Sequence, residues 1–417
     1  MVCTRTARDL RIDFFRGLVL IIIFVDHVPG NFLSRLTPKN FGFSNAADIF
    51  VFLAGISAAL AYFPTMSVNG FRAVLGRLMR RIAEIYSAHV VVLWLSMAVL
   101  LIATGVYNRL DFMGREIPTW VAADLWRAAW SSLALTLQPE YLDILPLYVV
   151  LLLSVPLFFL LESLRRGTGL AISIALWVVA EITGLNFPSS RSPAGWYFDP
   201  FAWQILFCIG LTAGIALLQG ARLPRSWWLI VPTVGYVVFA FVATAPCQLR
   251  VVAHLCQAAD PGSDVAHLPP WRIAHILALA YLATVMVPQK AAWLSSHVAQ
   301  SIVLLGRNSL PVFLAGVIVA LLGSIMLVEY GAGWLPDRKR HARPRRAGSH
   351  WCFDGNDRDG RKSDGQTATR GIHDKIQARV HPEEGRHAVF ENQRTSRLEV
   401  YWRFEDQTQW CRASVVD

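Results

Sequence analysis

The chain has 417 residues, of which 54% are hydrophobic and only 16% are charged, and its mean hydropathy is +0.41. Soluble domains carry about 25% charged residues, so this composition excludes a soluble globular protein and indicates a multi-pass membrane protein. Residues 337–417 hold 17 Lys and Arg and 13 Asp and Glu, so +6 of the net charge of +10 belongs to residues 1–336. This excess is typical of cytoplasmic loops and does not indicate a nucleic-acid-binding protein.

Apolar segments of membrane-spanning length recur along the chain, and a span needs about 20 residues. They predict an all-α helical bundle of about ten transmembrane helices, at residues 12–30, 46–64, 85–106, 120–138, 144–162, 169–185, 200–219, 226–245, 271–288 and 309–330. The fourth is the weakest, because Asp124, Arg127 and a tryptophan-rich side are typical of a helix that lies in the membrane interface. If this segment does not cross, the chain has nine spans, and every loop after residue 138 lies on the opposite side of the membrane from its place in the ten-span arrangement.

The first apolar segment contains four ionisable residues, Asp13, Arg16, Asp26 and His27. Eleven residues are about three helical turns, so Arg16 and His27 are expected on one face, roughly 16 Å apart. Ionisable groups in a bilayer are costly and mark a reaction or transport path. His27 is therefore predicted to act as a general acid and base. Asp26 should point away from His27, because successive residues of a helix are about 100° apart. The alternative to a catalytic role is that these residues form a capping cluster at the end of the helix, with Arg16 as a snorkelling residue.

Two further polar sites follow. Asp48 lies at the start of the second apolar segment. There it either interacts favourably with the helix dipole or belongs to the substrate site. Arg77, Arg80 and Arg81 recur at helical spacing ahead of the third segment. They are either topology charges or ligands for the phosphates of an acyl donor.

Other polar residues lie near the ends of later spans. Arg272 and His275 share one helix face, and Asn308 or Ser309 is favoured as a simple N-cap ahead of the last span. The complete set of predicted donor- and substrate-binding residues is Asp48, Arg77, Arg80, Arg81, Asp143, Asp199, Gln204, Arg272, His275 and Asn308. The cysteines lack metal-binding spacing, so we expect no metal and no bound cofactor.

Residues 333–417 differ in composition from the membrane domain predicted at residues 9–332. They are rich in Arg, Asp, Gly, Gln and His and lack a helical or strand period, which predicts a disordered tail. Because the change is abrupt, we favour an out-of-frame translation over a tail that binds anionic lipid or a partner. A small folded domain is disfavoured.

Arg16 and His27, separated by ten residues, resemble the first-span signature of the acyltransferase-3 superfamily of membrane O-acyltransferases. More specific blocks resemble the OpgC type, which succinylates osmoregulated periplasmic glucans in the bacterial inner membrane. These blocks are DFFRG at 13–17, DHVPGN at 26–31, GFS at 42–44, FVFLAG at 50–55, YLDILPLY at 141–148, DPFAWQ at 199–204, RIAH at 272–275 and GRNSLPVF at 306–313.

The resemblance implies a bacterial inner-membrane enzyme that uses an acyl-CoA, succinyl-CoA in particular, from the cytoplasmic side. The acceptor would be a hydroxyl of a periplasmic glucan or related saccharide. His27 carries over as the essential histidine with Arg16 as its motif partner, and Asp13, Asp48, Arg80 and Arg81 match positions common in the family. The alternatives are a saccharide or anion transporter or exporter that uses the same polar path, and an inactive truncated homologue.

Overall fold

The computed structural model describes residues 9–28, 31–107, 120–139, 142–248 and 266–330, together with four strands between residues 351 and 415. The chain divides into two units, Met1–Leu335 and Pro336–Asp417, which are considered separately.

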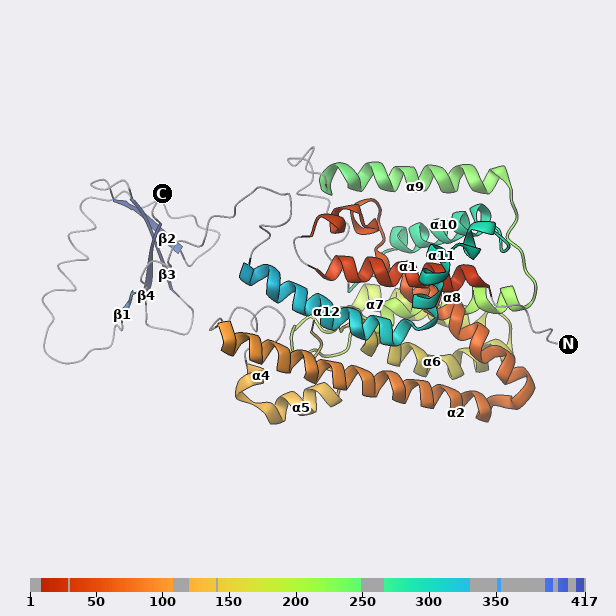
Figure 1. The fold of residues 1–417 in the computed structure, drawn as a ribbon, viewed down its shortest axis with the longest axis horizontal. Helices are drawn as coiled ribbons and strands as arrows, with labels where there is room; N and C mark the ends of the chain where they lie inside the picture. The colour runs from red at the N-terminus through yellow and green to blue at the C-terminus, as the bar shows by residue number, and fades with distance from the viewer. Residues whose placement is uncertain are drawn as a thin grey trace, which may run out of the picture. The chain divides into compact units, whose positions relative to one another are not determined.

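In the described part of the first unit, every regular secondary-structure element is a helix (Figure 1). Its α-helices are α1 (Leu10–His27), α2 (Ala46–Tyr107), α4 (Trp120–Ala123), α5 (Leu125–Leu133), α6 (Ile144–Leu164), α7 (Thr168–Thr183), α8 (Pro200–Leu218), α9 (Trp227–Gln248), α10 (Pro270–Met286), α11 (His297–Arg307) and α12 (Ser309–Tyr330). Three short 3₁₀ helices accompany them: η1 (Phe32–Leu36), η2 (Pro38–Asn40) and η3 (Ala292–Ser295).

Five of the described helices are long and apolar enough to cross a membrane: α2, α6, α8, α9 and α12. The apolar helices α7 and α10 are shorter, with 16 and 17 residues. Helix α1 has 18 residues and includes the charged Arg11, Asp13, Arg16 and Asp26. The expectation of an all-helical membrane unit therefore agrees with the structure.

The ten predicted spans are not confirmed, because residues 120–138 do not form one helix. They contain α4, with four residues, and α5, with nine. Nine residues rise only about 14 Å, which is less than half of a hydrocarbon core about 30 Å thick. The N-cap residue Asp124, whose carboxylate accepts a hydrogen bond from the Arg127 N–H at 2.8 Å, separates the two helices. This polar cap explains why the apolar segment is interrupted.

The second and third predicted spans belong to one helix, α2, which changes direction at Gly70 (Figure 1). The Gly70 φ of 76° lies in the left-handed region, which favours glycine. The Arg77 guanidinium donates a hydrogen bond to the Thr65 hydroxyl at 2.7 Å and so joins the two arms beside the bend. The sequence between the predicted spans is thus a helical corner.

Glycines bring two pairs of helices into backbone contact. A Cβ on Gly17 in α1 would overlap the Ile302 carbonyl in α11, and a Cβ on Gly306 would overlap the Asp13 carbonyl. In the same way, Gly55 in α2 meets the Phe207 carbonyl in α8. Small residues permit such close approach between membrane helices.

The described residues of the second unit form an antiparallel sheet in the order β1-β4-β3-β2. The strands are β1 (Trp351–Phe353), β2 (His387–Asn392), β3 (Arg397–Arg403) and β4 (Trp410–Val415). The expectation that the tail has no strand period is therefore wrong for these segments. In β3, Leu398, Val400 and Trp402 alternate with Glu399, Tyr401 and Arg403, which is the period of two of a strand. Whether the tail is a frame-shifted translation stays a prediction.

Candidate functional site

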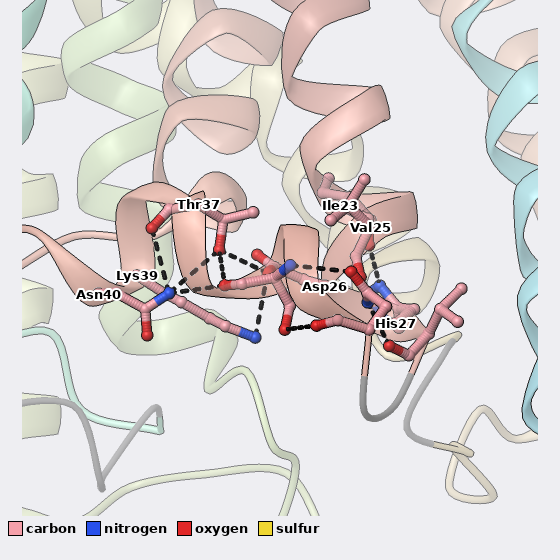
Figure 2. A network of polar contacts seen from close by, with 10 residues as sticks. Ile23, Val25, Asp26, His27, Thr37, Lys39 and Asn40 are labelled. Atoms are coloured by element: carbon pink, nitrogen blue, oxygen red, sulfur yellow. Dashed lines mark hydrogen bonds and ion pairs between the residues drawn. The ribbon is translucent and has the colours of Figure 1, made fainter. Parts of the chain in front are cut away.

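His27 is the last residue of α1 (Figure 2). Its Nδ1 lies 2.6 Å from the Ile23 carbonyl oxygen, one turn back along the helix. A carbonyl only accepts hydrogen bonds, so this contact requires a proton on Nδ1. In the neutral imidazole, Nε2 then carries the lone pair and is the nitrogen that can take a proton.

A partly polar cavity of about 360 Å³ lies beside His27. It is bordered by the end of α1, the starts of α2 and α6, and the segment ahead of α8; we call this the His27 end of the unit. Its lining residues are Ile23, Asp26, His27, Lys39, Asn45, Ala46, Ala47, Asp143, Ile144, Tyr197, Phe198 and Phe313. The structure thus brings Asp26, His27 and Asp143, three predicted site residues, to one cavity.

Asp26 is held by the segment that follows α1 (Figure 2). Its Oδ1 accepts a hydrogen bond from the Thr37 hydroxyl at 2.7 Å and lies 3.0 Å from the Lys39 ammonium. Both of these partners lie on the segment that connects α1 to α2. The Lys39 ammonium brings a positive charge to the cavity wall.

The opposite wall of the cavity comes from Asp143 and from residues 197–198. Asp143 is buried ahead of α6, whereas Tyr197 is 52% exposed. Neighbouring Asp199 is the N-cap of α8 and accepts a hydrogen bond from the Phe201 N–H at 2.9 Å. Burial raises the pKa of the Asp199 carboxyl to about 6, against the lowering effect of the backbone N–H donors of Phe201 and Ala202. Asp199 therefore anchors the residues that carry the cavity wall.

Arg16 lies in a packed ionic cluster nearer the start of α1. Its guanidinium donates to the Gly306 carbonyl at 3.3 Å and to the Ser57 hydroxyl, and it lies 3.8 Å from the Asp13 carboxylate. Asp13 is also 3.5 Å from the Arg307 guanidinium in α11. Arg16 and Asp13 thus join α1 to α2 and to α11.

The residues around Arg16 and His27 show which side of α1 each of these two side chains faces. Arg16 contacts α2 and α11, and His27 lines a cavity with the first residues of α2 and with Phe313 of α12. Both side chains therefore face the side of α1 that is covered by α2 and the α11–α12 region. Arg16, however, does not line the polar cavity.

Asp48 and Arg272 form a buried ion pair between α2 and α10. Both carboxylate oxygens lie 2.9 Å from the Arg272 Nε, and the two side chains are 0% and 2% exposed. Asp48 also accepts a hydrogen bond from the Asn45 N–H at 2.7 Å, and Arg272 lies over the Trp203 ring at 5.2 Å. This pair fixes the start of α2, where Ala46 and Ala47, together with the preceding Asn45, line the polar cavity.

His275 belongs to the same junction. Its Nδ1 lies 2.6 Å from the Ser44 hydroxyl, and a Cβ on Gly42 would meet the imidazole ring at 2.5 Å. Both His275 and Ser44 are buried. The predicted pair of Arg272 and His275 therefore holds the segment ahead of α2 and does not line the polar cavity.

Gln204 and Asn308 have local structural partners. The Gln204 amide oxygen accepts from the Ser173 hydroxyl at 2.6 Å, which joins α7 to α8. The Asn308 amide donates to the Leu304 carbonyl at 3.0 Å, so its side chain caps the C-terminus of α11 and not the N-terminus of the last span, where a cap was predicted.

Arg77, Arg80 and Arg81 lie after the Gly70 bend and are not part of the cavity wall. Arg81 pairs with Glu84 at 3.0 Å on the partly exposed helix surface. From Ala46 to Gly70 the helix rises about 36 Å, so this arginine cluster lies toward the other end of the unit. The structure does not bring it to His27.

Lys39, Tyr197 and Arg307 were not selected from the sequence. Lys39 is the only lysine before Lys290, and this rarity could have indicated a functional residue. Tyr197 precedes the predicted Asp199, but nothing in its spacing indicates a cavity. Arg307 follows Gly306 in what resembles a simple turn, and its contact with Asp13 spans 294 positions.

A family model described as OpgC protein matches residues 8–338 of the chain. Comparisons with curated proteins and with solved structures gave no match.

Proposed function

This chain belongs to the OpgC family, and we propose that it is a membrane O-acyltransferase that moves a succinyl or another short acyl group from an acyl-CoA to a saccharide hydroxyl. Family membership supports a transferase that modifies glucans. The observation that carries the proposal is the position of His27 on the wall of a polar cavity, with Nδ1 held by the Ile23 carbonyl.

His27 performs the proton transfers in this proposal. Its Nε2 accepts the proton of the acceptor hydroxyl while the hydroxyl oxygen attacks the thioester carbonyl. The C–S bond of the thioester breaks as the C–O ester bond forms, and the imidazolium returns the proton to the leaving thiolate. The Ile23 carbonyl keeps the ring in the required tautomer throughout.

The polar cavity is the proposed acceptor site. Carboxylates at Asp26 and Asp143 can accept hydrogen bonds from sugar hydroxyls, and the exposed Tyr197 ring provides an apolar face with a polar tip. The proposed acceptor is a periplasmic glucan or a related saccharide. For the donor, the exposed Arg77 and Arg80 are the proposed phosphate ligands, because guanidinium groups bind phosphate well. They lie toward the end of the unit opposite His27, so in this proposal the pantetheine arm of the acyl-CoA extends from them toward His27.

The topology that suits this chemistry has nine crossings, with the His27 end facing the periplasm of a bacterial inner membrane. Helices α6 and α8 begin at the His27 end, so Arg165, Arg166, Arg222 and Arg225 lie beyond their far ends. These arginines then share one side with residues 72–81, as the positive-inside rule favours. We expect a reporter fused after residue 166 to be cytoplasmic and one fused after residue 330 to be periplasmic. Ten crossings require the opposite result for both.

The decisive experiment replaces His27 by Gln, which keeps an amide donor for the Ile23 carbonyl but has no basic nitrogen. General acid–base catalysis contributes about 10²–10⁴-fold, so we expect glucan acylation in cells to fall by about 100-fold or more. The matched control is His297→Gln at the exposed start of α11. Acylation is read from glucan charge and ester content, with protein abundance measured in the same membranes.

Normal acylation by the His27→Gln variant at normal abundance would contradict the proposed role. The transporter alternative is tested with the same proteins. If vesicles take up labelled saccharide without acyl-CoA, and no ester forms when acyl-CoA is added, the transferase proposal is wrong.

A further inference from the structure

Lys39 borders the same polar cavity as His27. Among the described residues that line this cavity, these two are the only ones with a basic side chain. The Lys39 side chain is 41% exposed, whereas that of Asp26, its ionic partner, is 15% exposed. The ammonium is therefore more accessible to a ligand than the carboxylate that holds it.

Local contacts fix the position of Lys39 (Figure 2). Its ammonium lies 3.0 Å from Asp26 Oδ1, which also accepts a hydrogen bond from the Thr37 hydroxyl at 2.7 Å. Lys39 is the middle residue of η2, and the Asn40 side-chain amide donates to the Ser34 carbonyl at 2.6 Å. A free lysine side chain loses rotamer freedom when it binds a ligand, and Asp26 has already restricted this one. The ammonium is thus preorganised for binding.

The Lys39 ammonium has donors to spare. It carries three N–H groups, of which Asp26 Oδ1 occupies one. Because Lys39 and Asp26 together are neutral, binding of an anion depends on directed hydrogen bonds from the ammonium and not on a net positive charge of the wall. Such charge-assisted hydrogen bonds to a carboxylate are short and strong.

Lys39 and His27 are close enough to act on one acyl group. Asp26 directly precedes His27, and consecutive Cα atoms are about 3.8 Å apart. Since the Lys39 ammonium is 3.0 Å from Asp26 Oδ1, it lies within about 10 Å of the His27 Cα. The imidazole and a four-carbon acyl chain, with bonds of about 1.5 Å, together span this separation.

We propose that Lys39 binds the terminal carboxylate of a dicarboxylic acyl group, such as succinyl, and so selects an anionic acyl donor. The inference rests on the proposed transferase function and assigns a specificity-determining residue to it. The thioester carbonyl lies beside His27, and the two methylene groups of the succinyl chain extend toward Lys39. The acceptor hydroxyl approaches from the opposite wall, where Asp143 and Tyr197 lie.

The terminal carboxylate takes no part in the bond changes. The acceptor oxygen forms the ester C–O bond, the thioester C–S bond breaks, and the hydroxyl proton passes through His27 to the leaving thiolate. Lys39 therefore acts on the choice of donor, which separates its role from that of His27.

The experiment compares succinyl-CoA with succinamoyl-CoA, in which a neutral amide of similar size replaces the terminal carboxylate. Ester formation on a glucan is measured with the purified full-length protein in lipid vesicles. Lys39→Met should lower kcat/KM for succinyl-CoA by about 10- to 100-fold relative to succinamoyl-CoA, the effect of losing a hydrogen bond to a charged group. Lys39→Arg keeps a cation and should retain most of the preference for succinyl.

The matched control is Lys290→Met. Lys290 is exposed between α10 and η3 and does not line the polar cavity. This variant should leave the ratio of succinyl to succinamoyl transfer unchanged. The thermal unfolding midpoint of each protein is measured in the same vesicles, so that a loss of fold is separated from a change of donor preference.

Two results with Lys39→Met would overturn the inference. Equal loss of succinyl and succinamoyl transfer would mean that Lys39 only holds Asp26 and the cavity wall. A raised KM for the glucan with an unchanged preference between donors would assign Lys39 to the acceptor.

The unmodified protein distinguishes the inference from the proposed function. Equal use of succinyl-CoA and succinamoyl-CoA would remove the role of Lys39 and leave the transferase in place. Failure to form an ester from either donor or from acetyl-CoA would remove the proposed function itself.

Discussion

The two ends of α1 hold similar residues in different surroundings. Near its start, Asp13 and Arg16 are joined to α2 and α11 by ion pairs and by hydrogen bonds to Ser57 and Gly306. At its end, His27 and Asp26 border a cavity, although Asp26 is also held by Thr37 and Lys39. A polar residue in an apolar span can thus either join helices or face a space for ligands. Only its surroundings distinguish the two roles.

The same comparison applies to Asp48 and Arg272, which are fully enclosed, and to Asp143, which lines the polar cavity. We therefore expect substitutions in the packed groups to change stability first. Substitutions on the cavity wall should change kinetics first.

The largest effect is expected for Arg272→Met. It leaves the Asp48 carboxylate buried without its ionic partner, and breaking such a pair costs about 3–5 kcal/mol. The thermal unfolding midpoint in detergent should fall strongly. Arg81→Met is the control, because it removes an ion pair on the partly exposed helix surface, where such pairs contribute about 0–1 kcal/mol. Equal midpoints for the two variants would contradict the structural role of the buried pair.

A smaller loss of stability is expected for Arg16→Met. The change removes the hydrogen bonds that the partly exposed Arg16 guanidinium donates to Gly306 and Ser57, and we expect it to cost about 1.5–3 kcal/mol in total, the range for one hydrogen bond to a charged group. Asp13 retains Arg307 at 3.5 Å, so the buried carboxylate keeps one cationic neighbour. His27→Gln should unfold at nearly the same temperature as the unmodified protein. If Arg16→Met were as stable as His27→Gln but inactive, Arg16 would have a direct role in binding or chemistry.

Tyr197→Ala is expected to act on acceptor binding. An aromatic contact contributes about 0.5–1.5 kcal/mol, so the KM for the glucan should rise by about two- to tenfold with little change in kcat. The exposed Trp228, at the start of α9 and outside the polar cavity, provides the control as Trp228→Ala. A lower kcat with unchanged KM would mean that Tyr197 does not bind the acceptor.

The effect expected for Asp199→Asn appears only as a dependence of stability on pH. Because the native pKa of about 6 exceeds the ordinary 3.8, the folded protein binds a proton more tightly than the unfolded chain does. Asp199 therefore opposes folding above pH 6, and this penalty disappears as the pH falls toward 4. The unmodified protein should gain stability over that interval relative to Asp199→Asn, which retains an N-cap side chain.

The pH prediction is measured as the difference in unfolding midpoint between the two proteins from pH 4 to pH 7. Asp124→Asn, at the exposed N-cap of α5, is the control. A constant difference between the unmodified protein and Asp199→Asn would show that Asp199 does not titrate in this range.

The sequence by itself determined the class of the fold and most of the helix positions, because apolar length and helical period are local properties. It overestimated the spans, since the apolar character of residues 120–138 concealed the cap at Asp124. It also missed the strands of the tail, whose alternation is confined to short segments.

Only the tertiary structure separated the polar residues into roles. The helical period placed Arg16 and His27 on one face, but the partners of Arg16 come from positions 41 and 290 residues away. Asp48 and Arg272 are 224 positions apart, and the polar cavity combines residues from four regions of the chain. The sequence alone indicates which polar and charged side chains are costly to bury in a membrane helix. Which of them are compensated by protein partners, and which border a space, depends on helix packing.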